Sequence, residues 1–248
     1  MAAGLIGQTL AQAFLDEGAD VYIAHENLEK AEDVALQLGP RATTLYLDMN
    51  SRDSMSRFID RLADHGGIDV LVNHAFQIDI GEFLSISDED LDNGFKGNVR
   101  GAALTMIAVA RQMTELGKRG TILNRLGQLG STTKNRGAPF TAVFNAMNAA
   151  LVSLTQSAAI ALAPYGIRVN ALAPGPIVMP LWDYLDSDFA RLEHRQPGDK
   201  RRAVEEAVPM KRFGTATDLI GATLFLASEE ASFITGQVLD VDGGFGLI

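Results

Sequence analysis

The chain has 248 residues, with 21 Lys+Arg against 31 Asp+Glu and a formal net charge of −10. The hydrophobic share of 47% predicts a globular protein, and the absence of cysteine excludes disulfides, thiolate nucleophiles and cysteine-ligated metals. An acidic chain is repelled by nucleic acid and anionic membranes, so we expect neither as a partner, and no metal site is predicted. Residues 1–7 carry no basic targeting region, which favours a cytoplasmic protein with one domain over 1–248.

Helical and strand-like segments alternate along the chain. In chain order we expect a helix over 5–18, a strand over 19–24, a helix over 28–38, a strand over 43–48, a helix over 51–64, a strand over 67–73, a helix over 87–113, a strand over 120–124, a helix over 139–166, a strand over 167–172, a helix over 217–227 and a strand over 236–241. This alternation, with short Gly/Pro/Asp turns, predicts an α/β fold with a parallel sheet covered by helices on both faces. Such sheets bind ligands at the carboxyl ends of their strands.

Four segments resemble the short-chain dehydrogenase/reductase family in order and spacing. They are 69–75 (D-V-L-V-N-H-A), 98–101 (N-V-R-G), 166–175 (G-I-R-V-N-A-L-A-P-G) and 234–244 (I-T-G-Q-V-L-D-V-D-G-G). The resemblance implies a Rossmann-like doubly wound sheet with a variable lid at about 179–209. It also implies that the first strand is missing or truncated, which leaves about six strands. We expect the sheet to close by pairing the family's second and fourth strands, because unpaired central backbone groups are costly.

The resemblance also implies where the catalytic residues should stand. The family uses Tyr-x-x-x-Lys on its fifth helix and a serine after its fifth strand. Here the tyrosine position is assigned to Phe140, the lysine position to Phe144 and the serine position to Gly127, and only the asparagine Asn98 is retained. Phenylalanine has no ionisable proton, so general acid–base catalysis is unavailable there. We therefore expect no catalytic residue, and Phe140 and Phe144 serve as core aromatics one helical turn apart.

The family's cofactor positions are eroded as well. In the glycine-rich phosphate loop Gly7 remains, Leu5 replaces the middle glycine, and the first glycine would fall at Met1. The other positions carry His25 for the acid that grips the adenine ribose, Phe76 for a glycine, Met179 for a threonine, and the retained Asp48 and Asn73, which have structural uses. We therefore expect no cofactor in this chain, with NAD bound by a partner subunit.

These losses predict a non-catalytic subunit that stabilises or shapes an intact NAD-dependent family member. The helix over 139–164 is apolar on nearly all sides, so one face needs a partner. The resemblance implies a heterotetramer formed through the family's helices four and five and its C-terminal strand. The partner would oxidise a secondary alcohol, a hydroxyacyl-CoA such as 2-(α-hydroxybenzyl)succinyl-CoA in the benzylsuccinate β-oxidation of toluene degradation.

Two alternatives stay open. The chain could be a ligand-sensing protein that uses the vacated cofactor pocket. It could also be an enzyme with non-redox chemistry in the same cleft, with Arg125, His25, His74 and Glu26 as candidates.

The lid segment carries a local basic cluster. Its members are Arg191, His194, Arg195, Lys200, Arg201 and Arg202. They form either a solvated helical face or a contact for an anionic substrate such as a coenzyme A thioester.

Overall fold

The computed structural model describes residues 4–78, 80–127 and 139–247. The strands are β1 (Val21–His25), β2 (Ala42–Tyr46), β3 (Val70–Asn73), β4 (Gly120–Arg125), β5 (Ile167–Pro174) and β6 (Val238–Val241). The α-helices are α1 (Leu5–Asp16), α2 (Leu28–Leu38), α3 (Arg52–Asp64), α4 (Asp88–Phe95), α5 (Gly101–Glu115), α6 (Ala142–Leu162), α7 (Leu181–Leu192), α8 (Asp199–Ala207) and α9 (Ile220–Ala227). A π-helical turn, η2 (Lys96–Arg100), joins α4 to α5. The predicted alternation of strands and helices is confirmed.

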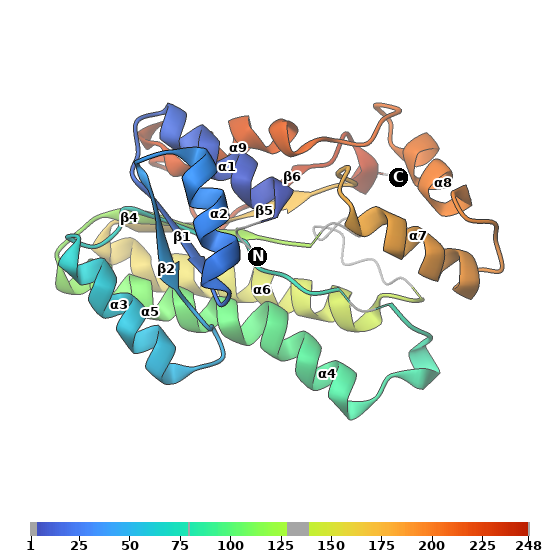
Figure 1. Ribbon diagram of the computed structural model, residues 1–248, viewed down its shortest axis with the longest axis horizontal. Helices are drawn as coiled ribbons and strands as arrows, with labels where there is room; N and C mark the ends of the chain where they lie inside the picture. Colours follow the sequence, from blue (N-terminus) through green and yellow to red (C-terminus); the bar gives the residue numbers. More distant parts are fainter. Residues whose placement is uncertain (1–3, 79, 128–138, 248) are drawn as a thin grey trace.

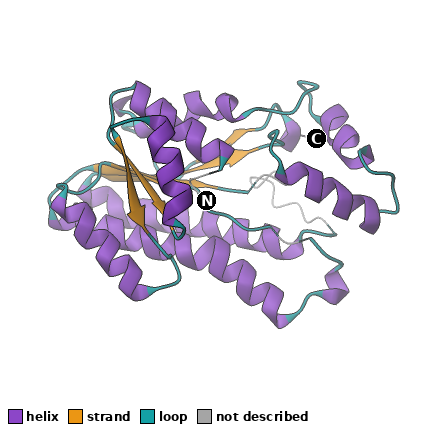
Figure 2. Ribbon diagram, in the orientation of Figure 1, coloured by secondary structure: helices purple, strands orange, loops and turns teal. Residues whose placement is uncertain are grey.

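The strands form two parallel sheets instead of one. β1 pairs with β2, and β3, β4, β5 and β6 pair in that order, so the described residues hold about the expected number of strands. Figure 2 shows the β1–β2 pair inclined steeply across the four-stranded sheet. With the family's first strand missing, β1 and β3 correspond to its second and fourth strands. The expected closure of the sheet between them is wrong, because no pairing joins β1 to β3 in the described ranges.

Helix α1 explains why the sheets stay apart. Its residues Ile6 and Leu10 pack with Leu123 of β4, whereas Ala11 packs with Ile23 of β1. One helix therefore lies against both sheets, with neighbouring residues Leu10 and Ala11 facing different strands. Burial of these apolar side chains opposes the closure that backbone pairing alone would favour.

Helices cover both faces of the four-stranded sheet. In Figure 1, α1 and α9 lie above it and α4, α5 and α6 lie below. Neighbouring residues of β4 point to opposite faces: Ile122 packs with Val109 of α5, and Leu123 packs with Leu226 of α9. The predicted doubly wound, Rossmann-like arrangement is confirmed.

Helix α6 is the longest helix in the described chain. With the turn after it, Ala142–Tyr165 is long and apolar enough to cross a membrane, a test that core helices of globular proteins also pass. Its inner residues Leu151, Thr155 and Ala159 are buried, whereas Ile160 is 80% exposed. Burial on nearly all sides is therefore not achieved within one copy of the chain. The cytoplasmic location stays a prediction.

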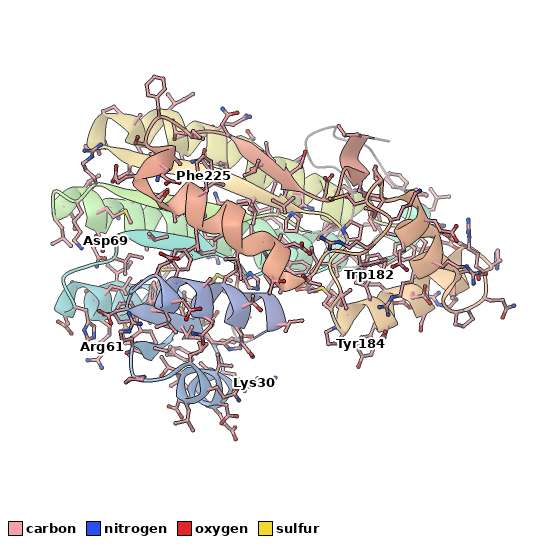
Figure 3. All side chains as sticks on the ribbon, turned by 90° about the horizontal axis from the view of Figure 1, so that it is seen from above. Lys30, Arg61, Asp69, Trp182, Tyr184 and Phe225 are labelled. Atoms are coloured by element: carbon pink, nitrogen blue, oxygen red, sulfur yellow. The ribbon has the colours of Figure 1, made fainter. Side chains whose placement is uncertain are left out.

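The expected lid segment forms two helices, α7 and α8. Trp182, Leu185 and Phe189 of α7 are buried in a cluster with Phe213. Figure 3 shows Trp182 toward the body of the protein and Tyr184 on the outer side of α7. An apolar inner face therefore fixes α7 beside the carboxyl ends of the strands.

Candidate functional site

The carboxyl ends of β3 and β4 carry a chain of buried amides. The Asn73 amide donates to Asn124 Oδ1 at 2.9 Å and to the carbonyl of Ala102 at 3.2 Å. Asn124 in turn donates to Thr155 Oγ1 of α6 at 2.9 Å. These bonds tie β3 and β4 to α5 and α6, so the structural use expected for Asn73 is confirmed.

Asn98 holds the segment that follows β3. Its Oδ1 accepts from the Gln77 N–H at 2.7 Å, and its Nδ2 donates to the Gln77 carbonyl at 2.8 Å. The turn η2 places this amide there, a distortion common at functional sites. Asn98 therefore positions the backbone beside Phe76.

An aromatic wall lies between these strands and α6. The rings of Phe76 and Phe144 are 6.3 Å apart between centroids. A Cβ added at Gly127 would come within 1.8 Å of Phe144 Cζ, so the ring occupies the space of any side chain there. Asn148 Oδ1 accepts from the Gly127 N–H at 2.9 Å. Gly127, Phe144 and Asn148 thus meet at one point.

This geometry moves the positions that correspond to the family's tyrosine and lysine one helical turn further along the chain than expected. Phe140 packs away from Gly127, in the cluster around Trp182, and its carbonyl accepts from the Gly81 N–H. Since the family's serine and tyrosine act on the same substrate oxygen, the position beside Gly127 is the tyrosine position. The structure favours Phe144 there.

Asn148 then stands at the lysine position, one turn further along α6. Placing the tyrosine at Phe140 and the lysine at Phe144 requires the family's usual loop length after the serine position. This chain is longer there, in the segment 128–138 that lies outside the described residues. Sequence reasoning missed Asn148, and the length of that segment was the available signal.

Arg125 ends β4 as a buried cation with few partners. The residue is 2% exposed, and its guanidinium lies 4.3 Å from the centroid of the Phe76 ring. Nη2 donates to the His74 carbonyl at 3.3 Å, whereas Nε and Nη1 have no partner among the described residues. Burial lowers the pKa of Arg125 to about 9, so the side chain stays charged at neutral pH.

His74 lies beside this cation. Its Nδ1 is buried and has no partner in the described part of the chain. Burial, and then the charge of Arg125, hold the pKa of His74 well below its ordinary value, so the imidazole is neutral at pH 7. The strand ends therefore hold two adjacent polar groups with unmet hydrogen-bonding capacity.

The expected cofactor positions are spread along the same edge. Helix α1 begins after Gly4 with no side-chain cap from a described residue, Gly7 lies in its first turn, and Leu5 is 51% exposed. The Leu5 side chain is thus directed to solvent instead of blocking the helix end. The first glycine position, Met1, lies outside the described residues.

The remaining positions serve turns and packing. His25 Nδ1 accepts from the Asn27 N–H at 2.8 Å, and Glu26 is exposed. Asp48 Oδ1 accepts from the Asn50 N–H at 2.8 Å. Met179 packs beside the Trp182 cluster. Across the described ranges, no three His, Asp or Glu side chains come together to hold a metal.

The basic cluster of the lid is matched by carboxylates. Its ion pairs are Arg191–Asp188, Arg195–Glu193, Lys200–Glu193, Arg201–Asp183 and Arg202–Asp199. Most of these side chains reach solvent, which fits the expected solvated face better than an anion contact.

Comparisons with known proteins match almost the whole chain. A family model described as enoyl-(acyl carrier protein) reductase matches residues 2–246. The chain is 42% identical over 240 residues to sorbitol dehydrogenase of Cereibacter sphaeroides, covering 96% of this chain and 92% of that protein. It is 38% identical to galactitol 2-dehydrogenase of Agrobacterium fabrum, covering 98% and 94%.

The fold also matches a solved structure closely. A gluconate 5-dehydrogenase from Burkholderia cenocepacia, in complex with NADP and tartrate, superposes with a TM-score of 0.86 and 29% identity, covering 100% of this chain and 93% of that one.

These findings correct three expectations. The non-catalytic subunit, the absence of enzymatic activity and the absence of a cofactor are contradicted, because the relatives are named as dehydrogenases and the structural neighbour was solved with NADP. The two alternatives, a sensor and a non-redox enzyme, are set aside for the same reason. None of these relatives is named for toluene degradation or for an inactive subunit of 2-(α-hydroxybenzyl)succinyl-CoA dehydrogenase.

Proposed function

Because the chain belongs to the short-chain dehydrogenase/reductase family, we propose that it is a nicotinamide-dependent dehydrogenase acting on a secondary alcohol of a polyhydroxylated substrate. The observation that supports this most is 42% identity, over nearly the full length of both chains, to a protein named sorbitol dehydrogenase. The next relative, at 38% identity, is named for galactitol, which is also a polyol.

The residues at the strand ends fit a dinucleotide. The N–H groups of the first turn of α1 have no side-chain cap among the described residues and suit a diphosphate. The unmet donors of Arg125 suit a polar or charged ligand, and Phe76 and Phe144 offer an apolar wall to a ring. Asp48 stands at the adenine-contact position. When bound, a nicotinamide ring supplies the hydride acceptor.

Among the described residues, the site offers no tyrosine–lysine pair for the alcohol proton. Gly127, Phe144 and Asn148 carry no group that accepts a proton at neutral pH. We propose that the proton passes to water, so that oxidation speeds up steadily with rising pH. Turnover is then slower than in a family member with an intact pair, since a positioned acid–base group contributes roughly 10²–10⁴-fold.

Assays of the purified chain test this function. Sorbitol, galactitol and gluconate are offered with NAD⁺ or NADP⁺, and reduced nicotinamide is followed by its absorbance. We expect slow formation of reduced cofactor with at least one substrate, at a rate that rises with pH. Absence of both turnover and dinucleotide binding would contradict the proposal.

We also propose that α5 and α6 pair with another chain of this family, a second copy or a homologue. An apolar groove runs between these helices, lined by Met106, Ile107, Ala110, Arg111, Thr114, Ala158, Ala161, Leu162 and Tyr165. Ile107 and Ile160 are 52% and 80% exposed, which is costly unless they are covered.

Light scattering of the pure chain gives its oligomeric mass. We expect a mass above that of one chain, reduced by Ile160→Glu. A monomeric mass for the unaltered chain, both alone and when mixed with a homologue from its host, would exclude this pairing.

A further inference from the structure

We propose that Arg125 is the binding site for an oxyanion, a carboxylate or a phosphate group, at the carboxyl end of β4. The ligand group would lie against the free donors of the guanidinium, beside His74 and Phe76. It would supply the negative charge that this part of the protein lacks.

Burial makes the unmet donors of Arg125 expensive. Its side chain is 2% exposed, yet Nε and Nη1 have no hydrogen bond within the described residues. Native proteins satisfy almost all buried polar atoms, and a buried charge without a partner costs several kcal/mol. The donors of Arg125 therefore need a partner that the described residues do not supply.

The described residues supply no counter-charge to Arg125. The ion pairs of the described residues do not include Arg125, and its pKa is lowered by burial with no carboxylate opposing that shift. The described surroundings of Arg125 therefore favour an anion from outside the chain.

The surroundings of Arg125 would strengthen a hydrogen bond to an oxyanion. The Phe76 ring on one face of the guanidinium keeps it desolvated, which strengthens a charge-assisted hydrogen bond. His74, neutral at pH 7, adds a second polar atom without a competing positive charge. Arg125 is two residues from Gly127, so an oxyanion held there lies beside the proposed reaction site.

Two kinds of molecule contain such an oxyanion. One is the diphosphate of the nicotinamide dinucleotide. The other is a carboxylate or phosphate at one end of the substrate, which would narrow the substrate class from neutral polyols to sugar acids or sugar phosphates. The assignment of the oxyanion to substrate or cofactor rests on the proposed dehydrogenase function. Oxyanion binding can be measured without turnover, so the Arg125 site and the dehydrogenase function can fail separately.

The experiment measures ligand-induced shifts in melting temperature and dissociation constants at constant ionic strength. Phosphate and gluconate are compared with chloride and sorbitol, and NAD⁺ is compared with nicotinamide riboside, which lacks phosphate. We expect the oxyanions to stabilise the unaltered protein. In Arg125→Met that stabilisation should vanish and affinity for the relevant oxyanion should fall by about tenfold or more. Arg125→Lys keeps the charge and should keep part of the effect.

Comparing the loss of NAD⁺ binding with the loss of gluconate or phosphate binding shows whether cofactor or substrate supplies the oxyanion. A loss confined to NAD⁺ assigns the cofactor diphosphate, and a loss confined to gluconate or phosphate assigns the substrate. Arg168→Met is the matched control, because Arg168 is already bonded to carbonyl groups and its loss should leave the anion shifts unchanged. Oxyanions that stabilise the unaltered protein no more than chloride, or equal shifts in Arg125→Met, would overturn the proposal.

Discussion

Two arginines on neighbouring strands of the same sheet have opposite surroundings. Arg168, at the start of β5, donates to the carbonyls of Leu226 at 2.9 Å and Ser228 at 3.0 Å. Arg125, at the end of β4, is more deeply buried, and its one hydrogen bond to a described residue is a weak one, to the His74 carbonyl at 3.3 Å. The amino end of the sheet uses its cation to join segments of the chain. At the carboxyl end, Nε and Nη1 of Arg125 have no partner among the described residues.

The difference separates a structural end of the sheet from a functional end. A satisfied cation contributes to folding, whereas an unsatisfied one costs free energy and persists only where a ligand repays it. The aromatic wall, the neutral His74 and the uncapped start of α1 all belong to the unsatisfied end. Substitutions at either end of the sheet test this difference.

The largest expected effect comes from restoring proton transfer at the functional end. Phe144→Tyr with Asn148→Lys should raise dehydrogenase turnover by roughly 10²–10⁴-fold, because a positioned general base replaces water. Steady-state rates of reduced-cofactor formation provide the measurement.

A matched control tests the register on which this rests. Phe140→Tyr with Phe144→Lys places the same pair one turn earlier, where Phe140 packs with the Trp182 cluster, and should not raise turnover. Equal gains in both variants, or a gain only in the control, would show that the structural register is wrong.

Swapping each arginine for methionine should give opposite changes in stability. Arg168→Met leaves carbonyls without donors and should cost about 2–4 kcal/mol of unfolding free energy. Arg125→Met removes an unpaired buried charge and, without ligand, should be neutral or stabilising by about 1–4 kcal/mol. Chemical denaturation in chloride buffer measures both. A strong loss of stability in Arg125→Met would mean that Arg125, like Arg168, stabilises the folded chain.

The aromatic wall provides a smaller test. Gly127→Ala places a Cβ on top of the Phe144 ring and should destabilise the protein by about 1–3 kcal/mol. Adding Phe144→Leu removes the clash and should recover much of that loss. Additive losses in the double variant would show that the two positions do not share one space.

The smallest effect is a pH dependence from His74. Its pKa is lowered in the folded state by burial and then by Arg125, so below about pH 6.5 the unfolded chain binds a proton that the native protein does not. Stability should fall as pH decreases, by up to about 1.4 kcal/mol per unit from this group. Denaturation between neutral and mildly acidic pH should show a shallower slope for His74→Gln. Identical slopes would place His74 in a solvated environment.

The sequence predicted the fold class because each strand is an apolar run and each turn carries its own Gly, Pro or Asp. It did not predict the division into two sheets, which depends on α1 packing against Leu123 and Ile23 at once. Backbone pairing follows local patterns, whereas this contact joins residues distant in the chain.

The site was predicted in part. Gly127 and Asn98 were placed from motifs, and the described structure brings Gly127 beside Phe144. The tyrosine and lysine positions were misplaced because the length of an irregular loop cannot be judged from helical spacing. Arg125 was singled out as a charged residue, but its lack of partners depends on the packing of Phe76 and His74 around it.

Mixing the concentrated protein with NAD⁺ or NADP⁺ and an excess of sorbitol or gluconate, and following the absorbance of reduced nicotinamide, tests the dehydrogenase function most directly. We expect slow accumulation of reduced cofactor that requires both protein and substrate and quickens as pH rises. Binding of neither dinucleotide, with no reduced cofactor at any pH, would contradict it.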